Sequence, residues 1–157
     1  MTQSPDRADL TALSDRMAYL LGLRVVIAAI TVAWSALRPE VLGVPLGNLL
    51  LVTGGYLAVS AVVEWARRRT SRFGYLLLTG LLLVDGLYLA FAMYATGGTQ
   101  SPIRFLTYLH LVAVSLLASY RTGLKIALWH SLLLFVVLYA QAAQLLPAVD
   151  VVPGRAI

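Results

Sequence analysis

The chain lacks cysteine, and only 12% of its 157 residues are charged. Without cysteine it can form no disulfide, no thiolate metal site and no cysteine nucleophile. It also lacks a Gly-x-x-x-x-Gly-Lys-Ser/Thr nucleotide loop, a His-Glu-x-x-His pair and a Gly-x-Ser-x-Gly elbow. Its two histidines, His110 and His130, are far from any set that would make a catalytic triad or a metal centre. We therefore predict no catalytic residue, no metal site and no cofactor required by a motif in this chain.

Hydrophobic residues, by contrast, make up 60% of the chain, well above the share in a soluble domain. Several apolar runs approach or exceed the roughly 18–20 residues that cross a bilayer as a helix. We therefore predict an all-α, polytopic transmembrane helical bundle embedded in a lipid bilayer. Its five spans lie at about 17–37, 46–65, 73–95, 103–119 and 124–146. Residues 1–16 are predicted to be a cytoplasmic tail and residues 147–157 an extracytoplasmic tail or loop.

The net charge of +5 comes from arginines clustered between the apolar runs, which favours membrane orientation rather than nucleic-acid binding. Eight basic residues lie in the N-terminal tail, the second-to-third loop and the fourth-to-fifth turn, against three in the segments on the other side. The excess predicts that the N-terminus is cytoplasmic. Five spans then leave the C-terminus outside, so we expect the chain to stop before a sixth span. A complete five-span protein is the alternative.

Ionisable side chains inside a membrane cost about 3 kcal/mol each, so each needs a partner, water or a function. Asp85 lies near the middle of the third span, roughly 18 Å from its cytoplasmic end, and Tyr88 shares its helix face. Asp85 is either a proton- or ligand-responsive group or a polar clamp to another helix. Arg24 lies about 10 Å inside the first span, within about one side-chain length of the depth of Asp85, and is the obvious partner, although it could instead extend to the cytoplasmic surface.

The fourth and fifth spans each carry a polar stripe. Arg104, Thr107 and His110 recur every three residues, and they either line a small polar pocket or leave the histidine bonded to a neighbouring helix. In the fifth span, the residues that share one narrow face are His130, Val137, Gln141 and Gln144. We favour interhelical hydrogen bonds for this second stripe over a proton path. Glycines 54 and 55 in the second span predict close helix packing.

Residues 96–102 form the one polar interruption between the third and fourth spans. Gly97 and Gly98 tolerate positive φ, Ser101 can cap the next helix, and Pro102 suits its first turn. The segment is therefore predicted to be a tight, pre-shaped hairpin.

This Gly-Gly-x-x-Ser-Pro loop resembles that of the membrane input region of PilS-like sensor histidine kinases. It is also similar to the Gly-Gly-x-x-Asn-Pro loop of the RegB/PrrB redox sensor kinases, with Ser101 in place of Asn and Ile103 in place of Phe. The start of the first span, from Tyr19 to Arg24, resembles the PilS type as well.

The resemblance implies the membrane sensory input domain of a two-component sensor histidine kinase in a bacterial-type inner membrane. It further implies a homodimer and a cytoplasmic kinase region in cis, and the redox type implies quinone as a ligand. The candidates for a signal or ligand pocket are Gly97, Gly98, Ser101, Pro102, Asp85, Tyr88, Arg104 and His110. The other functions considered are a small proton- or ion-coupled transporter or channel subunit and a structural partner of another membrane protein.

Overall fold

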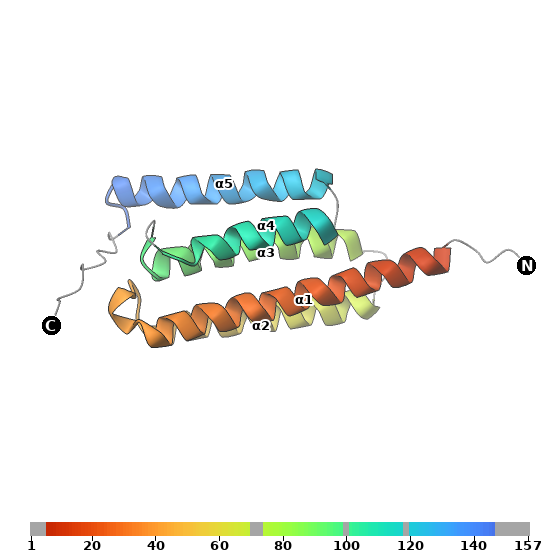
Figure 1. Cartoon of the computed structure of the whole chain (residues 1–157), viewed down its shortest axis with the longest axis horizontal. Helices are drawn as coiled ribbons and strands as arrows, with labels where there is room; N and C mark the ends of the chain where they lie inside the picture. Colours follow the sequence, from red (N-terminus) through yellow and green to blue (C-terminus); the bar gives the residue numbers. More distant parts are fainter. Residues whose placement is uncertain (1–5, 70–73, 99–100, 118–119, 147–157) are drawn as a thin grey trace, which may run out of the picture.

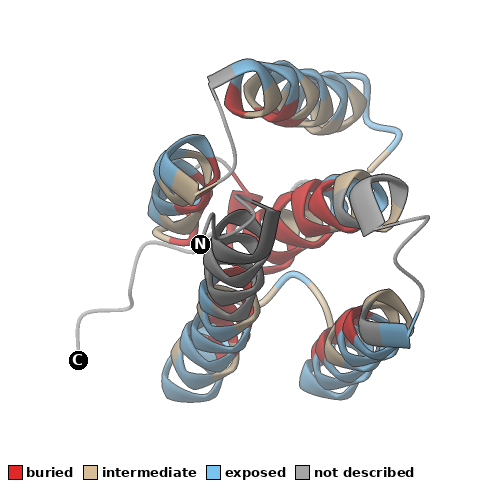
Figure 2. Ribbon diagram, turned by 90° about the vertical axis from the view of Figure 1, so that its right-hand side faces the viewer, coloured by how far each residue is buried: buried red, intermediate tan, exposed pale blue. Residues whose placement is uncertain are grey.

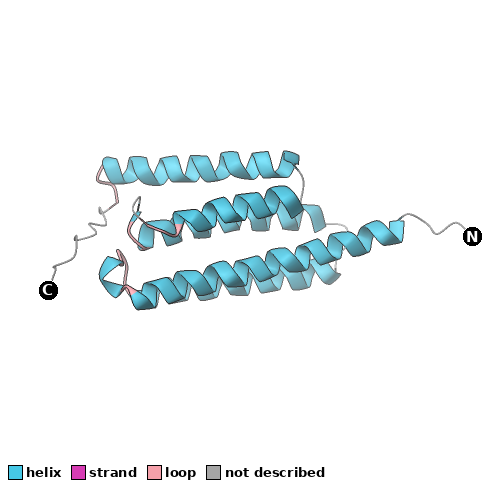
Figure 3. Ribbon diagram, viewed as in Figure 1, coloured by secondary structure: helices cyan, strands magenta, loops and turns pink. Residues whose placement is uncertain are grey.

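The computed structural model describes residues 6–69, 74–98, 101–117 and 120–146. In these ranges the regular elements are all helices, joined by loops and turns, and there is no strand (Figure 3). The elements are α1 (Asp6–Leu37), the short 3-10 helix η1 (Pro39–Val41), α2 (Leu46–Arg69), α3 (Gly74–Ala95), α4 (Arg104–Leu117) and α5 (Tyr120–Ala142). The all-α class predicted from the sequence is confirmed.

The five long helices lie side by side with their axes roughly aligned, and consecutive helices run in opposite directions (Figure 1). α3 packs against α2, α4 and α5, while α1 packs against α2 and α4. The α1–α2 connection, the α3–α4 connection and the C-terminal end of α5 therefore gather at one end of the bundle (Figure 1). The backbone N–H of Gly43 donates to the carbonyl of Ala95 over 2.9 Å, which fixes the first of these connections to the end of α3.

The polarity of the bundle is the reverse of that of a soluble protein. Its outer surface is apolar, and Leu51, Leu116 and Leu128 are each more than 70% exposed. The buried faces turn toward the middle of the bundle, as Figure 2 shows, and they carry many polar side chains. A soluble helix shows the opposite pattern, with an apolar inner stripe and a polar outer face. Apolar surface outside and polar groups satisfied inside are what a lipid environment requires.

In the described part of the chain, three helical segments are long and apolar enough to cross a membrane: Tyr19–Leu37, Leu46–Arg67 and Arg121–Ala142. Two shorter apolar segments, Thr79–Ala95 and Arg104–Leu117, complete the bundle. Together with the apolar outer surface, these segments mark the chain as a membrane protein.

The last helix differs from the prediction at both ends. The sequence predicts a short turn between Arg121 and Lys125 and a fifth span from about residue 124. In the structure, these residues lie within the first turns of α5. Buried Gly123 allows this, because a side chain there would collide with Ser115 of α4. α5 then ends at Ala142, and Gln144, with φ of 57°, adopts the left-handed conformation that terminates many helices.

The prediction that glycines 54 and 55 pack closely against another helix is wrong within the described chain. A Cβ atom built on Gly54 or Gly55 meets no other atom within 4 Å. The close approach occurs instead at Gly86, where a Cβ would lie 2.8 Å from the indole of Trp129. A glycine pair in sequence shows that close packing is sterically possible, whereas the rotation of the helix decides whether a neighbour is there.

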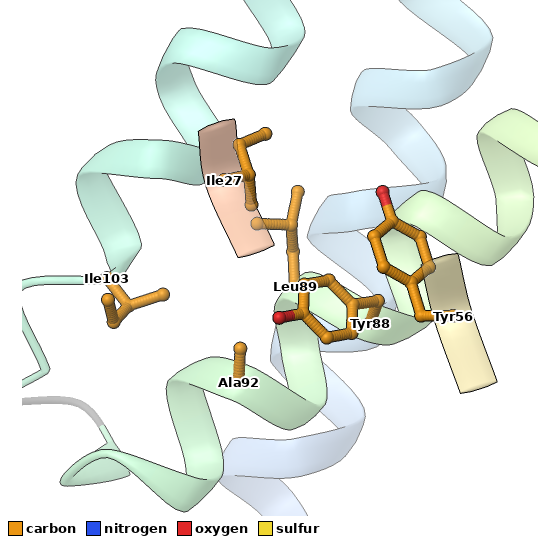
Figure 4. Close-up of a cluster of buried hydrophobic side chains, with 6 residues drawn as sticks. All are labelled: Ile27, Tyr56, Tyr88, Leu89, Ala92 and Ile103. Atoms are coloured by element: carbon orange, nitrogen blue, oxygen red, sulfur yellow. The ribbon is translucent and has the colours of Figure 1, made fainter. Parts of the chain in front are cut away.

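Apolar packing surrounds the polar interior in two clusters. One is formed by Leu20, Leu82, Val114 and Ile126, and the other by Ile27, Tyr56, Tyr88, Leu89, Ala92 and Ile103 (Figure 4). Because these residues come from all five helices, the core sets the rotation of each helix about its axis. That rotation determines which polar groups face one another.

Candidate functional site

Asp85 of α3 lies at the centre of the polar interior, with 1% of its surface exposed. Arg24 of α1, 3% exposed, holds it by a forked pair of bonds. Its Nε donates to Oδ1 over 2.8 Å, and its Nη2 donates to Oδ2 over 2.8 Å. This bidentate geometry is the strongest arrangement for an arginine–carboxylate pair. The prediction that Arg24 is the partner of Asp85, rather than extending to the surface, is confirmed.

Tyr56 of α2 completes the contacts of Asp85, and sequence reasoning missed it. Its hydroxyl donates to Oδ1 of Asp85 over 2.9 Å, and only 6% of the residue is exposed. Its ring stacks on that of Tyr88, with centroids 4.0 Å apart and planes within 1° of parallel. Figure 4 shows the two rings next to each other. Tyr88 in turn shares a hydrogen bond of 3.2 Å with the hydroxyl of Thr53 on α2. Tyr88 therefore lies beside the carboxylate but does not bind it.

His110 of α4 and His130 of α5 approach the same carboxylate from the remaining side of the bundle. Nε2 of His110 lies 3.7 Å from Oδ2 of Asp85, just beyond hydrogen-bond distance. The two imidazole rings lie with their centroids 5.5 Å apart. Nδ1 of His130 is 2.8 Å from the carbonyl of Ile126, to which its N–H donates. Both ring nitrogens of His110, and Nε2 of His130, have no hydrogen-bond partner among the described residues.

Each of the five helices thus contributes a titratable side chain to this part of the interior. We call this set the polar cluster: Arg24, Tyr56, Asp85, His110 and His130. The cluster combines a satisfied ion pair with unsatisfied imidazoles. An unsatisfied buried polar atom costs about 1–3 kcal/mol, so such atoms are the part of the cluster with most to gain from a new partner.

The Gly-Gly loop is a buried, internally bonded hairpin in its described part. Gly97 and Gly98 have φ of 114° and 61°, as the hairpin prediction required. Oγ of Ser101 accepts the backbone N–H of Ile103 over 3.1 Å, which confirms the cap, and it lies 2.6 Å from the hydroxyl of Thr96. Ser101 and Thr96 are each 1% exposed, so these two polar residues of the loop are buried in the bundle and not in contact with water. Pro102 lies in the turn that leads into α4.

The stripe on α4 divides between outside and inside. Thr107 and His110 are buried, but Arg104 is exposed and its guanidinium lies 5.2 Å from the ring centre of Phe105. The prediction that Arg104 lines a polar pocket together with His110 is therefore wrong. Because α4 begins at Arg104, this side chain lies at the end of the bundle and can turn toward its surface.

The stripe on α5 is also only partly inside. His130 is buried, while Gln141 is half-buried and its amide approaches the loop at Gly98, where a Cβ would lie 3.1 Å from Nε2. Gln144 is exposed and lies beyond the end of α5, so the prediction that it contacts another helix is wrong. The prediction of this stripe depended on a helix that continues to residue 146, whereas α5 ends at Ala142.

Two polar groups that sequence reasoning missed, Thr53 and Tyr56, lie one turn apart on α2 and flank the glycine pair. The spacing of three residues was a detectable signal, because such residues share a helix face. Of the residues predicted for one pocket, the structure brings Asp85, Tyr88 and His110 together. It places Gly97, Gly98 and Ser101 nearer to the end of the bundle.

Among the described residues, no three His, Cys, Asp or Glu side chains are grouped so as to hold a metal ion. Comparisons with models of protein families, with curated proteins and with solved structures find no match.

Proposed function

We propose that this chain is the membrane-embedded sensory input domain of a two-component sensor histidine kinase. In this proposal all five long helices cross a bacterial-type inner membrane, and the N-terminus is cytoplasmic. The chain works as a homodimer and passes its signal to a cytoplasmic kinase region in cis. The Gly-Gly loop then lies on the extracytoplasmic side.

The observation that carries the proposal is the polar cluster, to which every helix contributes one side chain. A sensor needs a signal that changes the relative free energy of two helix arrangements. A ligand, a partner helix or an ion that alters the bonds of Asp85 acts on α1, α2 and α3 at once, because Arg24 and Tyr56 hold the same carboxylate. The resemblance of the Gly97–Pro102 loop to that of sensor kinases supports the same function.

The test begins with the gene. Reading the frame past the codon for Ile157 should show a sixth apolar span and then a kinase region. The whole gene product is then placed in membrane vesicles, and its autophosphorylation is measured with labelled ATP. Asp85→Asn should change the rate of autophosphorylation by about 5-fold or more, which is the lower end of the usual range for energetic coupling between two sites.

The matched control is Arg38→Gln, which removes a charge from an exposed ion pair with Glu40. It should leave the rate unchanged. A stop codon directly after that of Ile157, or equal rates for Asp85→Asn and Arg38→Gln, would contradict the proposal.

One observation favours a second function, that of a proton-coupled transporter or channel subunit. The two buried imidazoles, with their unpartnered nitrogens, resemble the histidine relays of pumps and transporters. Proton uptake into vesicles that contain this chain alone, abolished by His110→Gln, would establish this function in place of the first.

A further inference from the structure

The hydrogen bonds of Asp85 differ in length, and the longest is on the oxygen that faces His110. An ionised carboxylate offers about four lone-pair positions, and four contacts occupy them here. Oδ1 accepts the Nε group of Arg24 over 2.8 Å and the hydroxyl of Tyr56 over 2.9 Å. Oδ2 accepts the Nη2 group of Arg24 over 2.8 Å and shares its Nε group over 3.1 Å. This Oδ2 atom lies 3.7 Å from Nε2 of His110, a nitrogen without a hydrogen-bond partner among the described residues.

Four groups from the other helices face or share this contact. Arg24 of α1 and Asp85 of α3 form an ion pair whose charges cancel. Tyr56 of α2 bonds the same carboxylate, and the ring of His130 of α5 lies 5.5 Å from that of His110. With both histidines neutral, the cluster therefore carries no net charge. If His110 binds a proton, the only carboxylate of the cluster with which it can pair is that of Asp85, which is already paired with Arg24.

We propose that His110 is a proton-binding site that controls the packing of α4 on α3. A proton adds to the free lone pair of the imidazole, no bond breaks, and both ring nitrogens become donors. The Nε2–H group then donates to Oδ2 of Asp85 and replaces the 3.1 Å contact from Nε of Arg24, which keeps its 2.8 Å bond to Oδ1. A charge-assisted bond of this type is about 2.7–2.9 Å long, so the two atoms must close by roughly 1 Å. Because Asp85 is fixed by α1 and α2, it is α4 that moves.

His130 serves as the internal comparison. Its Nδ1–H already donates to the carbonyl of Ile126, one turn earlier on its own helix. Protonation of His130 at Nε2 therefore leaves its existing bond in place, and the ion pair of Asp85 with Arg24 is unchanged. An unperturbed histidine changes its charge between pH 5 and 8, and burial and a neighbouring carboxylate shift that change in opposite directions, so the contact with Asp85 affects the pH at which His110 binds a proton.

The inference names the proton as the signal of the proposed sensory domain, and only that step rests on the proposed function. Proton binding itself is a property of this chain. The whole 157-residue chain, with its histidines labelled with carbon-13, is placed in lipid nanodiscs and titrated by NMR. The chain has two histidines, so His130→Gln assigns both signals.

We expect the His110 signal to titrate reversibly between about pH 4 and pH 9 and to keep doing so in His130→Gln. Asp85→Asn should lower the midpoint by about 1–3 pH units, the usual effect of losing a nearby opposite charge. Tyr56→Phe should raise it, because the change removes a competing donor and leaves the carboxylate and the ring stack. These opposite signs separate a specific contact from general loosening of the bundle, which would move both midpoints the same way.

A His110 signal that does not titrate in this range, or a midpoint that is the same in the wild type, Asp85→Asn and Tyr56→Phe, would overturn the inference. The two proposals also fail separately. If His110 titrates as expected while kinase activity is unaffected by Asp85→Asn, the sensor function is wrong and the proton site stands. If Asp85→Asn alters kinase activity while His110 fails to titrate, the sensor stands and the proton is not its signal.

Discussion

At the scale of single residues, the contribution of the buried Arg24–Asp85 pair to stability depends on two opposing terms. Burying two charges removes them from water, and their attraction repays that cost only where the geometry is good and other bonds are satisfied. Here the pair is bidentate and Tyr56 adds a third donor. Replacing only one partner is costly because it leaves the other buried without compensation.

We therefore expect Asp85→Asn and Arg24→Gln each to lower the free energy of unfolding by about 3–5 kcal/mol. The double variant should lose less than the sum of the two, because the second change removes a charge that the first left unpaired. Unfolding in detergent micelles, followed by circular dichroism, measures all three.

Arg38→Gln is the control for this experiment. Its pair with Glu40 is 3.5 Å long, and both side chains are about 60% exposed, so its loss should cost about 0–1 kcal/mol. Equal losses for Asp85→Asn and Arg38→Gln would show that the buried pair is not formed as described.

At the scale of the helices, glycine positions set how closely α5 approaches α3. Gly86→Ala would place a methyl group 2.8 Å from the Trp129 indole and 3.2 Å from His130. Overpacking of this kind costs about 1–3 kcal/mol, and here it should also weaken the 3.1 Å bond from the indole N–H to the carbonyl of Leu83. The same unfolding assay measures the loss, and tryptophan fluorescence reports the displaced indole.

Gly80 on the same helix is the matched control, because a Cβ there meets nothing within 4 Å. Gly80→Ala should leave stability unchanged or raise it by up to about 1 kcal/mol, the difference in helix propensity. A loss at Gly80 as large as that at Gly86 would mean that propensity and not contact determines the effect.

The helices themselves could be predicted from the apolar runs, and the Arg24–Asp85 pair could be predicted from depth. Depth follows directly from the rise of 1.5 Å per residue. The contact of Tyr56 with Asp85 could not be predicted this way, because it depends on how α2 is rotated against α3. In an apolar helix surrounded by lipid and protein, the hydrophobic pattern is nearly uniform and gives little information about rotation.

The helix ends were predicted least well, since they depend on single close contacts. Gly123 allows α5 to begin earlier, against Ser115, and the left-handed residue Gln144 ends it earlier. Neither feature alters the composition of the apolar run from which the span was predicted. The exposure of Arg104 and Gln144 follows from the same cause, because both lie where their helices begin or have already ended.

At the scale of the whole molecule, the apolar surface and the basic residues together predict an orientation in the membrane. α2 has 24 residues and is therefore about 36 Å long, enough to cross the hydrocarbon core. Glu40 precedes one end of α2 and Arg69 closes the other, where the guanidinium lies 4.5 Å from the ring centre of Trp65. Most of the basic residues outside the predicted spans belong to the tail and loops on the side of Arg69, and the positive-inside rule predicts that this side is cytoplasmic.

Because the chain has no cysteine, single introduced cysteines test this orientation without background labelling. Glu40→Cys and Arg69→Cys both replace exposed residues. In intact spheroplasts, a maleimide that cannot cross membranes should label Glu40→Cys and leave Arg69→Cys unlabelled until the cells are lysed. The reverse result would invert the bundle and place the Gly-Gly loop in the cytoplasm. Labelling of both sites in intact cells would mean that α2 does not cross the membrane. In that case the polar cluster would have to be explained as part of a bundle that lies outside the bilayer.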